Sequence, residues 1–552
     1  MDTFSAARRE LLKYSSLGLV TAAAPFAALA QSSGATAGSS NSMIFNVRAF
    51  GATGDGKTVD TPAVNKAIAA AAAGGGGTVY FPAGTYLCFS IRLQSQVHLF
   101  LAQGSIILAA DSPLPNQQTG FNGGTYDAAE PNTAYDAFQD YGHNHWHNSL
   151  LWGESIYDLS VTGPGLIYGK GLSFGASREA RGAYPIYKAE QPGVGNKAIA
   201  LKNCRNVIFR DFSILKGGHF GLLLTGVDNL TIDNLKIDTD RDGMDIDCCK
   251  NVRVSNCTVN SPWDDGICPK SSFALGYNRP TENLTITNCF VSGCYELGSV
   301  LDGTFKKFAA DAHVPRTGRI KCGTESNGGF KNITISNCVF EGCQGLALES
   351  EDGALCEDIT ISNITQRDVI QAPLFFRLGA RLRGPRGTGN QSTVVGTLQR
   401  VLVDNFVSYN TNSRVCSILS GIPGHEIRDI KLSNVYIQHE GGAYGDLVKV
   451  VPPENIEKYP DPGMFGPMPA GGFFFRHVRN LELSHVEIAP MNPDPRPSFY
   501  LTDVGRADFL AVTAPTSSQA PAFGLHDVKD LRIMLSRAGR DTVLATADNQ
   551  TL

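Results

Sequence analysis

An unusual concentration of carboxylates marks the middle of the 552-residue chain. Five aspartates lie close together, at Asp238, Asp240, Asp242, Asp245 and Asp247, and two more follow further along, at Asp264 and Asp265. Where three such carboxylates converge within a few ångströms, they repel one another and the pKa of at least one is raised. A protonated carboxyl beside ionised ones suits glycoside hydrolysis, in which one group protonates the leaving oxygen and another activates water or attacks carbon.

Two other interpretations of these aspartates stay open. Calcium takes six to eight oxygen ligands, which such a cluster can supply. The aspartates also fit a stack of acidic turns on the outside of the protein. We favour catalysis, and we assign no metal ligand and no cofactor to the chain.

The elements that must position these aspartates come from a short repeat. Asn or Asp is followed by alternating apolar and polar residues and by a closing polar residue, and this period of two is typical of β-strands. Clear copies begin at Asn206, Asn229, Asn251, Asn283, Asn332, Asp358, Asp429 and Asn480. The first two intervals between copies are too short for a strand–helix–strand crossover but fit one coil of a solenoid. The second of these intervals also separates Asp242 from Asp264, so we expect the two to lie one above the other on one face.

Stacked copies of this strand predict an all-β fold, a right-handed parallel β-helix, because no single copy can bury its apolar face alone. We expect one β-helix domain over residues 43–540, followed by a C-terminal tail at 541–552. The N-terminal end of a solenoid must be covered. Thr61 and Pro62 open an alanine-rich stretch that ends at Gly74, which predicts a short capping helix with proline near its first position.

The thirteen cysteines follow the same repeat. Cys257, Cys289 and Cys338 each come directly after the closing Asn of a copy. In stacked coils these positions form ladders inside the β-helix, where a thiol behaves as a small apolar side chain. We therefore expect mostly free thiols, although an exported protein leaves room for a few disulfides.

The N-terminal segment has the features of an export signal. Arg8 and Arg9 precede an apolar stretch that ends at Ala30 in a small–x–small cleavage pattern. We expect a twin-arginine-type signal peptide over 1–30, a flexible leader over 31–42, and a mature protein in the periplasm or outside the cell.

The composition of the chain argues against nucleic acid and membranes as binding partners. A charged fraction of 18% and a net charge of −5 argue against a basic nucleic-acid-binding protein. No later apolar run approaches the roughly 20 residues that span a bilayer, so we expect no membrane partner after export. The oligomeric state is not set by the sequence.

The aspartate segments resemble those of glycoside hydrolase family 28, the polygalacturonases and their relatives. The segment from Asp242 to Asp247 is similar to the family's Asn-Thr-Asp-Gly-Ile-Asp, and Trp263 to Ser271 is similar to its Asp-Asp segment. The resemblance covers most of residues 43–440. It implies a β-helix and inverting hydrolysis of a pectic polysaccharide. It also implies that Asp264 is the general acid and that Asp242 and Asp265 together activate the attacking water.

Two positions depart from the family pattern. The family's Gly-His-Gly segment is expected in the coil after Asp264 and Asp265, where this chain has residues 292–298 and no histidine. The family's Arg-Ile-Lys segment holds the sugar carboxylate by charge-assisted hydrogen bonds. The same three residue types occur in this chain from Arg319 to Lys321.

Counting coils instead places Ala347-Leu348-Glu349 at the Arg-Ile-Lys position, because the stretch around Glu325 resembles a segment that the family has one coil earlier. Either Arg319 and Lys321 still reach the cleft, or the preferred sugar is not galacturonate. The candidates for substrate binding are accordingly Lys270, Arg319, Lys321, Glu325 and Glu349.

Two further segments carry chemistry-bearing side chains. The arginines at 377, 381, 383 and 386 form a positive run that either grips an anionic polymer or belongs to a solvated loop. The polar segment 117–147 holds His143, His145 and His147, which we expect in a loop that walls the cleft rather than in a metal site.

The sequence thus predicts an exported glycoside hydrolase whose partner is a pectic polysaccharide. Long insertions before Asn206 and after Asp429 would close one end of the groove and favour exo cleavage. A calcium-dependent β-helix polysaccharide lyase and a non-catalytic carbohydrate-binding β-helix are the alternatives.

Overall fold

The computed structural model describes residues 43–140, 142–173, 191–386, 394–411, 415–443, 445–516 and 520–552. The expected signal peptide and leader lie outside these residues. In the part of the chain described, no helix combines the length and apolar composition needed to cross a membrane.

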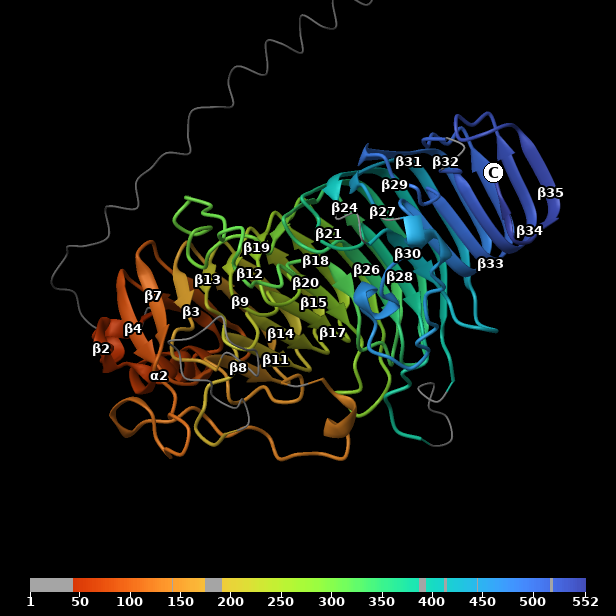
Figure 1. Ribbon diagram of the computed structural model, residues 1–552. Helices are drawn as coiled ribbons and strands as arrows, with labels where there is room; N and C mark the ends of the chain where they lie inside the picture. Colours follow the sequence, from red (N-terminus) through yellow and green to blue (C-terminus); the bar gives the residue numbers. More distant parts are fainter. Residues whose placement is uncertain are drawn as a thin grey trace, which may run out of the picture. The chain divides into compact units, whose positions relative to one another are not determined.

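Each coil contributes one short strand to each of three faces. One coil holds β17 (Met244–Asp247), β18 (Lys250–Ser255) and β19 (Thr258–Asn260), and the next holds β20 (Ile267–Lys270), β21 (Thr281–Thr287) and β22 (Phe290–Ser292). β17 pairs with β20, β18 with β21 and β19 with β22, and all three pairings are parallel. The parallel β-helix predicted from the repeat is therefore confirmed (Figure 1).

The first face carries the aspartate segments. Besides β17 and β20 it contains β5 (Ile91–Arg92), β8 (Leu151–Glu154), β11 (Ile199–Lys202), β14 (Leu222–Thr225), β23 (Lys321–Cys322), β26 (Leu346–Ser350), β28 (Leu374–Leu378) and β30 (Ser417–Ser420).

The second and third faces repeat in the same way. The second also contains β1 (Ile44–Asn46), β3 (Gly77–Phe81), β6 (Val97–Leu101), β9 (Tyr157–Thr162), β12 (Arg205–Arg210), β15 (Asp228–Asp233) and β24 (Phe330–Ser336). The third also contains β2 (Asp55–Val59), β4 (Gly84–Cys88), β7 (Ser105–Ala109), β10 (Leu166–Tyr168), β13 (Ser213–Leu215), β16 (Lys236–Asp238) and β25 (Val339–Glu341).

Towards the C-terminus the strands of neighbouring faces merge into long ones. These are β27 (Leu355–Arg367), β29 (Thr397–Thr411), β31 (Ile427–Gly441), β32 (Phe473–Asn492), β33 (Phe499–Leu510) and β34 (Phe523–Met534). The segment 541–552, expected as a C-terminal tail, instead forms β35 (Thr542–Ala547) and β36 (Gln550–Thr551), which pair antiparallel with β34. These antiparallel strands cover the edge of the last coil.

The asparagines of the repeat make the turns between faces. Asn229, Asn251 and Asn332 adopt φ values of 52°, 58° and 54°, in the left-handed region that asparagine tolerates better than most residues. Their side chains also bond from coil to coil, as where Asn229 Nδ2 donates to Asn206 Oδ1 at 2.9 Å. The same residue type therefore fixes both the turn and the stacking.

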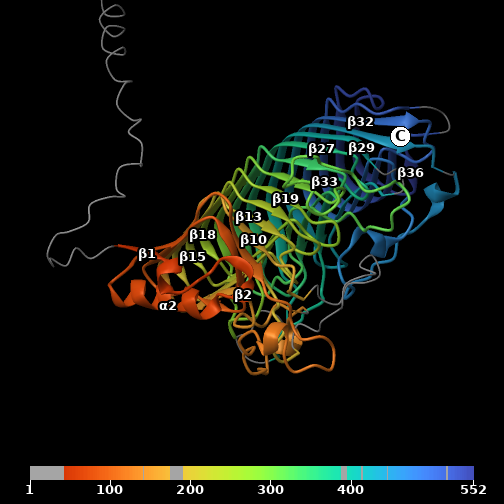
Figure 2. The ribbon, with the colours of Figure 1, turned by 90° about the vertical axis from the view of Figure 1, so that its left-hand side faces the viewer.

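The capping helix is present as α2 (Thr61–Ala73), which lies at the N-terminal end of the stack next to β1 (Figure 2). Its buried face, Val64, Ala67, Ile68 and Ala71, belongs to the same apolar core as the coils. Short 3-10 helices occur at η1 (Val47–Phe50), η2 (Phe121–Gly123), η3 (Asp136–Phe138), η5 (Gly445–Lys449) and η6 (Pro462–Phe465).

All thirteen cysteines are buried and free. The thiols of Cys257, Cys289 and Cys338 interact in a ladder along the inside of the third face. Burial raises the pKa of the Cys356 thiol to about 12. The expectation of mostly free, interior thiols is confirmed.

Candidate active site

Asp242 and Asp265 occupy the same position in consecutive coils, directly before β17 and β20. The Gly243 amide donates to the Asp265 carbonyl at 2.9 Å, and Met244 pairs with Ile267. Carboxylate oxygens of Asp242 and Asp265 lie within 4.8 Å of each other. These two predicted catalytic residues therefore meet in space.

Asp264 directly precedes Asp265 in the chain and is more exposed to solvent than either member of this pair. Its carboxylate accepts hydrogen bonds from Arg241 at 2.7 and 3.2 Å, and 28% of its side chain is exposed. Asp242 and Asp265 are almost fully buried. Because Met244 pairs with Ile267 on this face, the residue across the sheet from Asp242 is Asp265, and Asp264 lies over Arg241.

The two buried carboxylates have opposite tendencies. Burial raises the pKa of Asp242 well above its usual range, and the negative charges of Asp264 and Asp245 add to the effect. Burial alone would also raise the pKa of Asp265, but the positive charges of Lys321 and Arg319 outweigh it and hold that pKa low. The site therefore places a carboxyl group whose pKa is raised beside a carboxylate whose pKa is lowered.

Arg319 and Lys321 provide the charges that keep Asp265 ionised. Arg319 Nε donates to Asp265 Oδ1 at 2.8 Å, and Lys321 Nζ is in an ion pair with the other oxygen. Ile320 bridges to Ile267, which places this segment in the coil directly after the Asp264–Asp265 coil. On the first face, this coil is therefore formed by the segment around Arg319, which follows the insertion 293–317.

The open question of the Arg-Ile-Lys register is answered by the next pairing. Lys321 pairs with Ala347 and Cys322 with Leu348, so Glu349 belongs to the following coil. Ala347, Leu348 and Glu349 thus lie one coil after the stretch from Lys321 to Glu325, as the count of coils placed them. Arg319 and Lys321 do reach the carboxylates, and both already bind Asp265.

The other predicted substrate-binding residues lie beneath the carboxylates. Glu325 and Glu349 are fully buried, and Glu349 accepts from Thr324 Oγ1 at 2.9 Å. Their burial matches that of Asp265. Burial would lower the pKa of the Lys270 ammonium, but neighbouring negative charges, Asp245 and Asp242 among them, raise it well above its usual value.

The sequence interpretation expected His143 in a loop that walls the cleft but gave it no role, and the structure brings it into the site from the segment before β8. Its Nδ1 lies 2.5 Å from Glu325 Oε2, and its Nε2 lies 3.6 Å from Asp245 Oδ2. The ring packs edge-on against Phe220, with 4.7 Å between centroids. The signal in the sequence was the group of histidines at 143–147, but the contact spans 182 residues and no local pattern predicts it.

Three arginines of the run are held by other parts of the protein, while Arg386 is exposed. Arg377 is fully buried and donates to the Gly421 carbonyl at 2.9 Å. Arg381 pairs with Asp352 at 2.5 Å. Arg383 forms an ion pair with Asp140, which belongs to the same segment as His143. The run thus ties the loop before β8 to the coils that follow the site.

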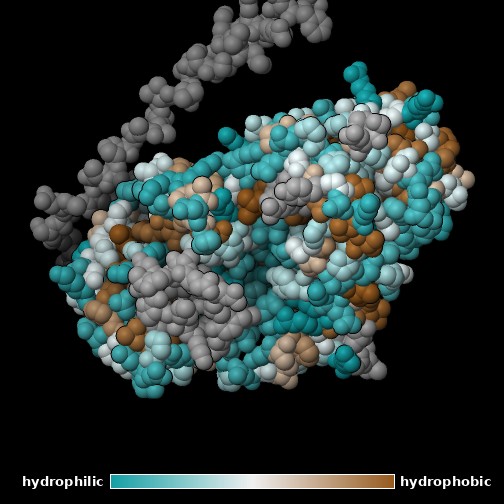
Figure 3. All heavy atoms as spheres, in the orientation of Figure 1, coloured by the Kyte–Doolittle hydropathy of each residue, from teal (hydrophilic) through white to brown (hydrophobic). Residues whose placement is uncertain are grey.

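The surface over β17 and β20 is hollowed. In the space-filling view a recess with hydrophilic walls opens over this part of the first face (Figure 3). Segment 442–472, inserted between β31 and β32, reaches the site from the C-terminal side. Tyr459 belongs to this segment, and the centroid of its ring lies 6.0 Å from Lys321 Nζ.

Two family models match the chain. The model described as "Rhamnogalacturonase A/epimerase, pectate lyase-like" matches residues 44–139, and "Right handed beta helix region" matches residues 197–368. The second match confirms the handedness that was expected for the coils.

The relatives agree with the resemblance drawn from the aspartate segments. A probable polygalacturonase of Vitis vinifera is 26% identical over 312 residues, which make up 51% of this chain and 58% of the relative. This chain therefore covers little more than half of that relative.

Solved structures show the same fold at low sequence identity. The family 28 exopolygalacturonase of Yersinia enterocolitica superposes with a TM-score of 0.57 and 17% identity, over 86% of this chain and 78% of that one. An exopolygalacturonase from Thermotoga maritima gives a TM-score of 0.53 and 17% identity, over 72% and 87%.

Proposed function

We propose that this polygalacturonase-like β-helix protein is a glycoside hydrolase that cleaves O-glycosidic bonds of a pectic polysaccharide. The observation that carries the proposal is the meeting of Asp242 and Asp265 within 4.8 Å, beside the partly exposed Asp264. Glycoside hydrolysis needs one protonated and one ionised carboxyl group at the bond that is cut. The two cations on Asp265 keep that carboxylate ionised, as the role of base requires, and the more exposed Asp264 is available as the acid.

Distances suggest how the three aspartates divide the work. In inverting enzymes the acid and the base stand about 6.5–9.5 Å apart, which leaves room for the attacking water. Asp242 and Asp265 are closer than that, so we assign the pair to the water. Asp265 accepts the proton of the water, while Asp242 holds the water in place.

Asp264 is then the general acid at the rim of the recess. Its negative charge is the largest charge effect on the pKa of Asp242. As the more exposed carboxyl group, Asp264 donates a proton to the leaving oxygen. Arg241, paired with Asp264, positions the carboxyl group for that transfer.

We further propose exo cleavage. The segment before β8 reaches Asp245 through His143, and segment 442–472 reaches Lys321 through Tyr459. A groove bounded by these two segments accepts the end of a polymer more readily than its middle. Large oligomers released early in a digest would contradict this part of the proposal.

The decisive experiment is a digest of pectic fractions followed by assays of reducing ends and of the anomer of the product. Hydrolysis with inversion supports the proposal. An unsaturated product that absorbs in the near ultraviolet, and activity that a chelator abolishes, would identify a lyase instead. Binding without any cleavage would leave a carbohydrate-binding β-helix.

Export is proposed for the same protein on the basis of segment 1–30. Fractionation of cells that express the full chain, with and without replacement of Arg8 and Arg9 by lysine, tests it. Retention of the variant in the cytoplasm is the expected result for a twin-arginine signal.

A further inference from the structure

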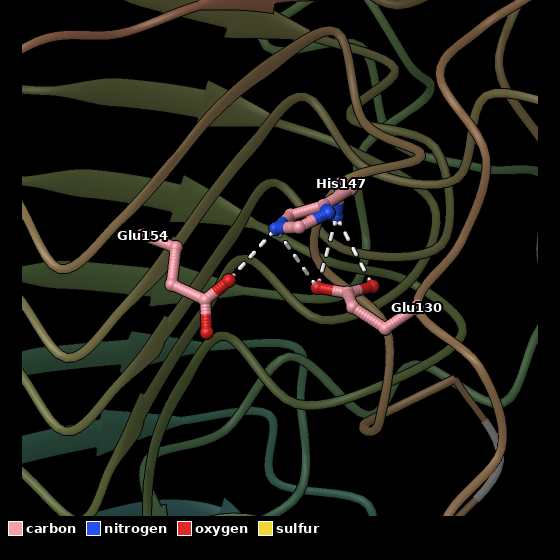
Figure 4. Close-up of side chains that lie close together, drawn as sticks. All are labelled: Glu130, His147 and Glu154. Carbon is pink, nitrogen blue, oxygen red and sulfur yellow. Dashed lines mark hydrogen bonds and ion pairs between the residues drawn. The ribbon is translucent and has the colours of Figure 1, made fainter.

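A second cluster of ionisable side chains lies outside the carboxylate site. Glu130 and His147 come from the segment before β8, and Glu154 is the last residue of β8 (Figure 4). His147 Nε2 lies 2.9 Å from Glu154 Oε2 and 3.5 Å from Glu130 Oε1. One imidazole nitrogen thus faces two carboxylates.

From this arrangement we propose a binding site for a divalent transition metal ion, with Zn²⁺ as the best-suited ion. Ligand atoms bound tetrahedrally at about 2.0–2.1 Å from an ion lie roughly 3.3 Å from one another. The two nitrogen–oxygen distances fall on either side of that value, and all three ligand atoms lie within 4.8 Å of one another. The geometry therefore needs only small side-chain shifts to receive an ion.

The ligands are held in place by their surroundings. The Glu130 carboxylate accepts hydrogen bonds from the backbone amides of Trp146 and His147 at 3.0–3.3 Å. The His147 ring stacks on Trp152, with 3.9 Å between centroids. Outer contacts of this kind fix ligand orientation in metal sites.

Charges around the cluster leave room for a cation. Lys202 Nζ lies 3.6 Å from Glu154 Oε1, the oxygen that faces away from His147, and 4.2 Å above the Trp146 ring. The other neighbouring group is His145, whose Nδ1 lies 4.0 Å from Glu130 Oε2. With neutral histidines, the cluster and Lys202 together carry one net negative charge.

Space for solvent borders one of the three ligands. A cavity of about 160 Å³ has Glu130, Trp146 and Lys202 in its walls. Three protein ligands leave a fourth position of a zinc ion open to water.

The place of the cluster suggests what the ion does. Glu154 pairs across the sheet with Lys202, and the same row continues through Thr225 to Asp247. The cluster therefore lies three coils from the carboxylates, roughly 14 Å at about 4.8 Å per coil. His147 follows His143 by four residues. An ion bound here therefore fixes the position of the segment that carries His143 into the active site.

The test is a titration of the metal-free full chain with Zn²⁺, Mn²⁺ and Ca²⁺, followed by calorimetry and by thermal unfolding. We expect one equivalent of Zn²⁺ to bind and to raise the unfolding temperature. Glu154→Gln and His147→Gln should each weaken Zn²⁺ binding at least tenfold. Glu282→Gln, which removes a comparably exposed carboxylate paired with Lys250 at 2.7 Å, should bind as the wild type does.

Two outcomes would overturn the site. Absence of stoichiometric Zn²⁺ binding would mean that His147 serves only as a polar bridge between the two carboxylates. Equal binding by the wild type and both variants would place the ion elsewhere, for example on thiols. Circular dichroism of each variant establishes that the chain is folded before its affinity is interpreted. None of these readouts uses the hydrolase activity. A failure of the metal site can therefore be distinguished from a failure of the proposed function.

Discussion

Arg319 Nε donates to Asp265 Oδ1 at 2.8 Å, and this bond joins residues 54 positions apart in the chain. Together with Lys321 it fixes the ionised state of a fully buried carboxylate. It also occupies two cations that would otherwise be free to bind the carboxylate of a sugar. The same contact therefore bears on both the chemistry and the choice of substrate.

The first prediction concerns this ion pair. Arg319→Met leaves the buried Asp265 with one cation, and loss of one partner of a buried pair costs about 3–5 kcal/mol of unfolding free energy. Urea denaturation at neutral pH should show a loss of that size. Arg532→Met, which removes an arginine from an exposed pair with Asp530, should change the unfolding free energy by less than about 1 kcal/mol.

The pH dependence of that loss gives a further check. The folded-state pKa of Asp265 is depressed, so its contribution to stability is present above the unfolded pKa, near 4, and disappears as the pH falls further. The difference between wild type and Arg319→Met should therefore shrink below about pH 4. A difference that stays constant down to pH 2 would contradict the pairing.

A second prediction tests the general acid. Asp264→Asn should lower turnover about a hundredfold to ten-thousandfold, because a general acid typically contributes that much. The side chain is partly exposed, so the thermal unfolding temperature should change little. Asp429→Asn is the matched control, since other copies of the repeat carry Asn at this turn. Full activity in Asp264→Asn would remove it from the role of acid.

Local sequence could predict the coils but not every register. The alternation around Asn229 and Asn251 specifies strands and turns, because each copy carries its own apolar face and its own left-handed asparagine. It could not reveal that one extra residue lies between Asn260 and Ile267. Asn260 pairs with Asp238 and Ile267 pairs with Met244, so the offset between partners grows by one from the third face to the first. That residue makes Asp265, not Asp264, the partner of Asp242.

Long-range contacts account for what the sequence interpretation left out. The match of residue types pointed to Arg319 and the count of coils pointed to Glu349, and only the pairing of Lys321 with Ala347 shows that the two lie one coil apart. His143 reaches the site only because its loop folds back over the first face, where its ring nitrogen meets the Glu325 carboxylate. Such a contact depends on two loops at once, and no periodicity in either loop reports it.

A third prediction uses the buried Asp245, whose pKa burial raises to about 6. A raised folded-state pKa stabilises the fold below the unfolded pKa of 3.8, and the contribution is lost as the pH rises towards 6. Asp245→Asn keeps the uncharged state at every pH. The variant should therefore gain about 3 kcal/mol relative to wild type between pH 4 and pH 7, at 1.36 kcal/mol per pKa unit. Parallel stability curves for the two proteins would contradict the raised pKa.

A fourth prediction concerns His143 as a positioning residue. In His143→Gln the pKa of Glu325 should rise, because burial raises it and the charge of His143 counteracts that effect. Glu325, close to Asp245, would then keep its proton up to a higher pH. This should shift the acidic limb of the pH–activity profile and lower kcat more than it raises KM. His98→Gln, at a half-buried histidine bonded to Thr78 and Thr162, should leave the profile unchanged. A change in stability alone, with an unchanged profile, would reduce His143 to a structural residue.

A fifth prediction follows from the thiol ladders. Every cysteine is buried, and burial raises the pKa of thiols such as that of Cys204, to about 11, so the reactive thiolate is scarce at neutral pH. Ellman's reagent should therefore find almost no reactive thiol in the native protein. In guanidinium without a reductant it should find thirteen per chain. Each disulfide would lower that count by two, so a smaller number in protein purified from an oxidising compartment would show that part of a ladder is oxidised there.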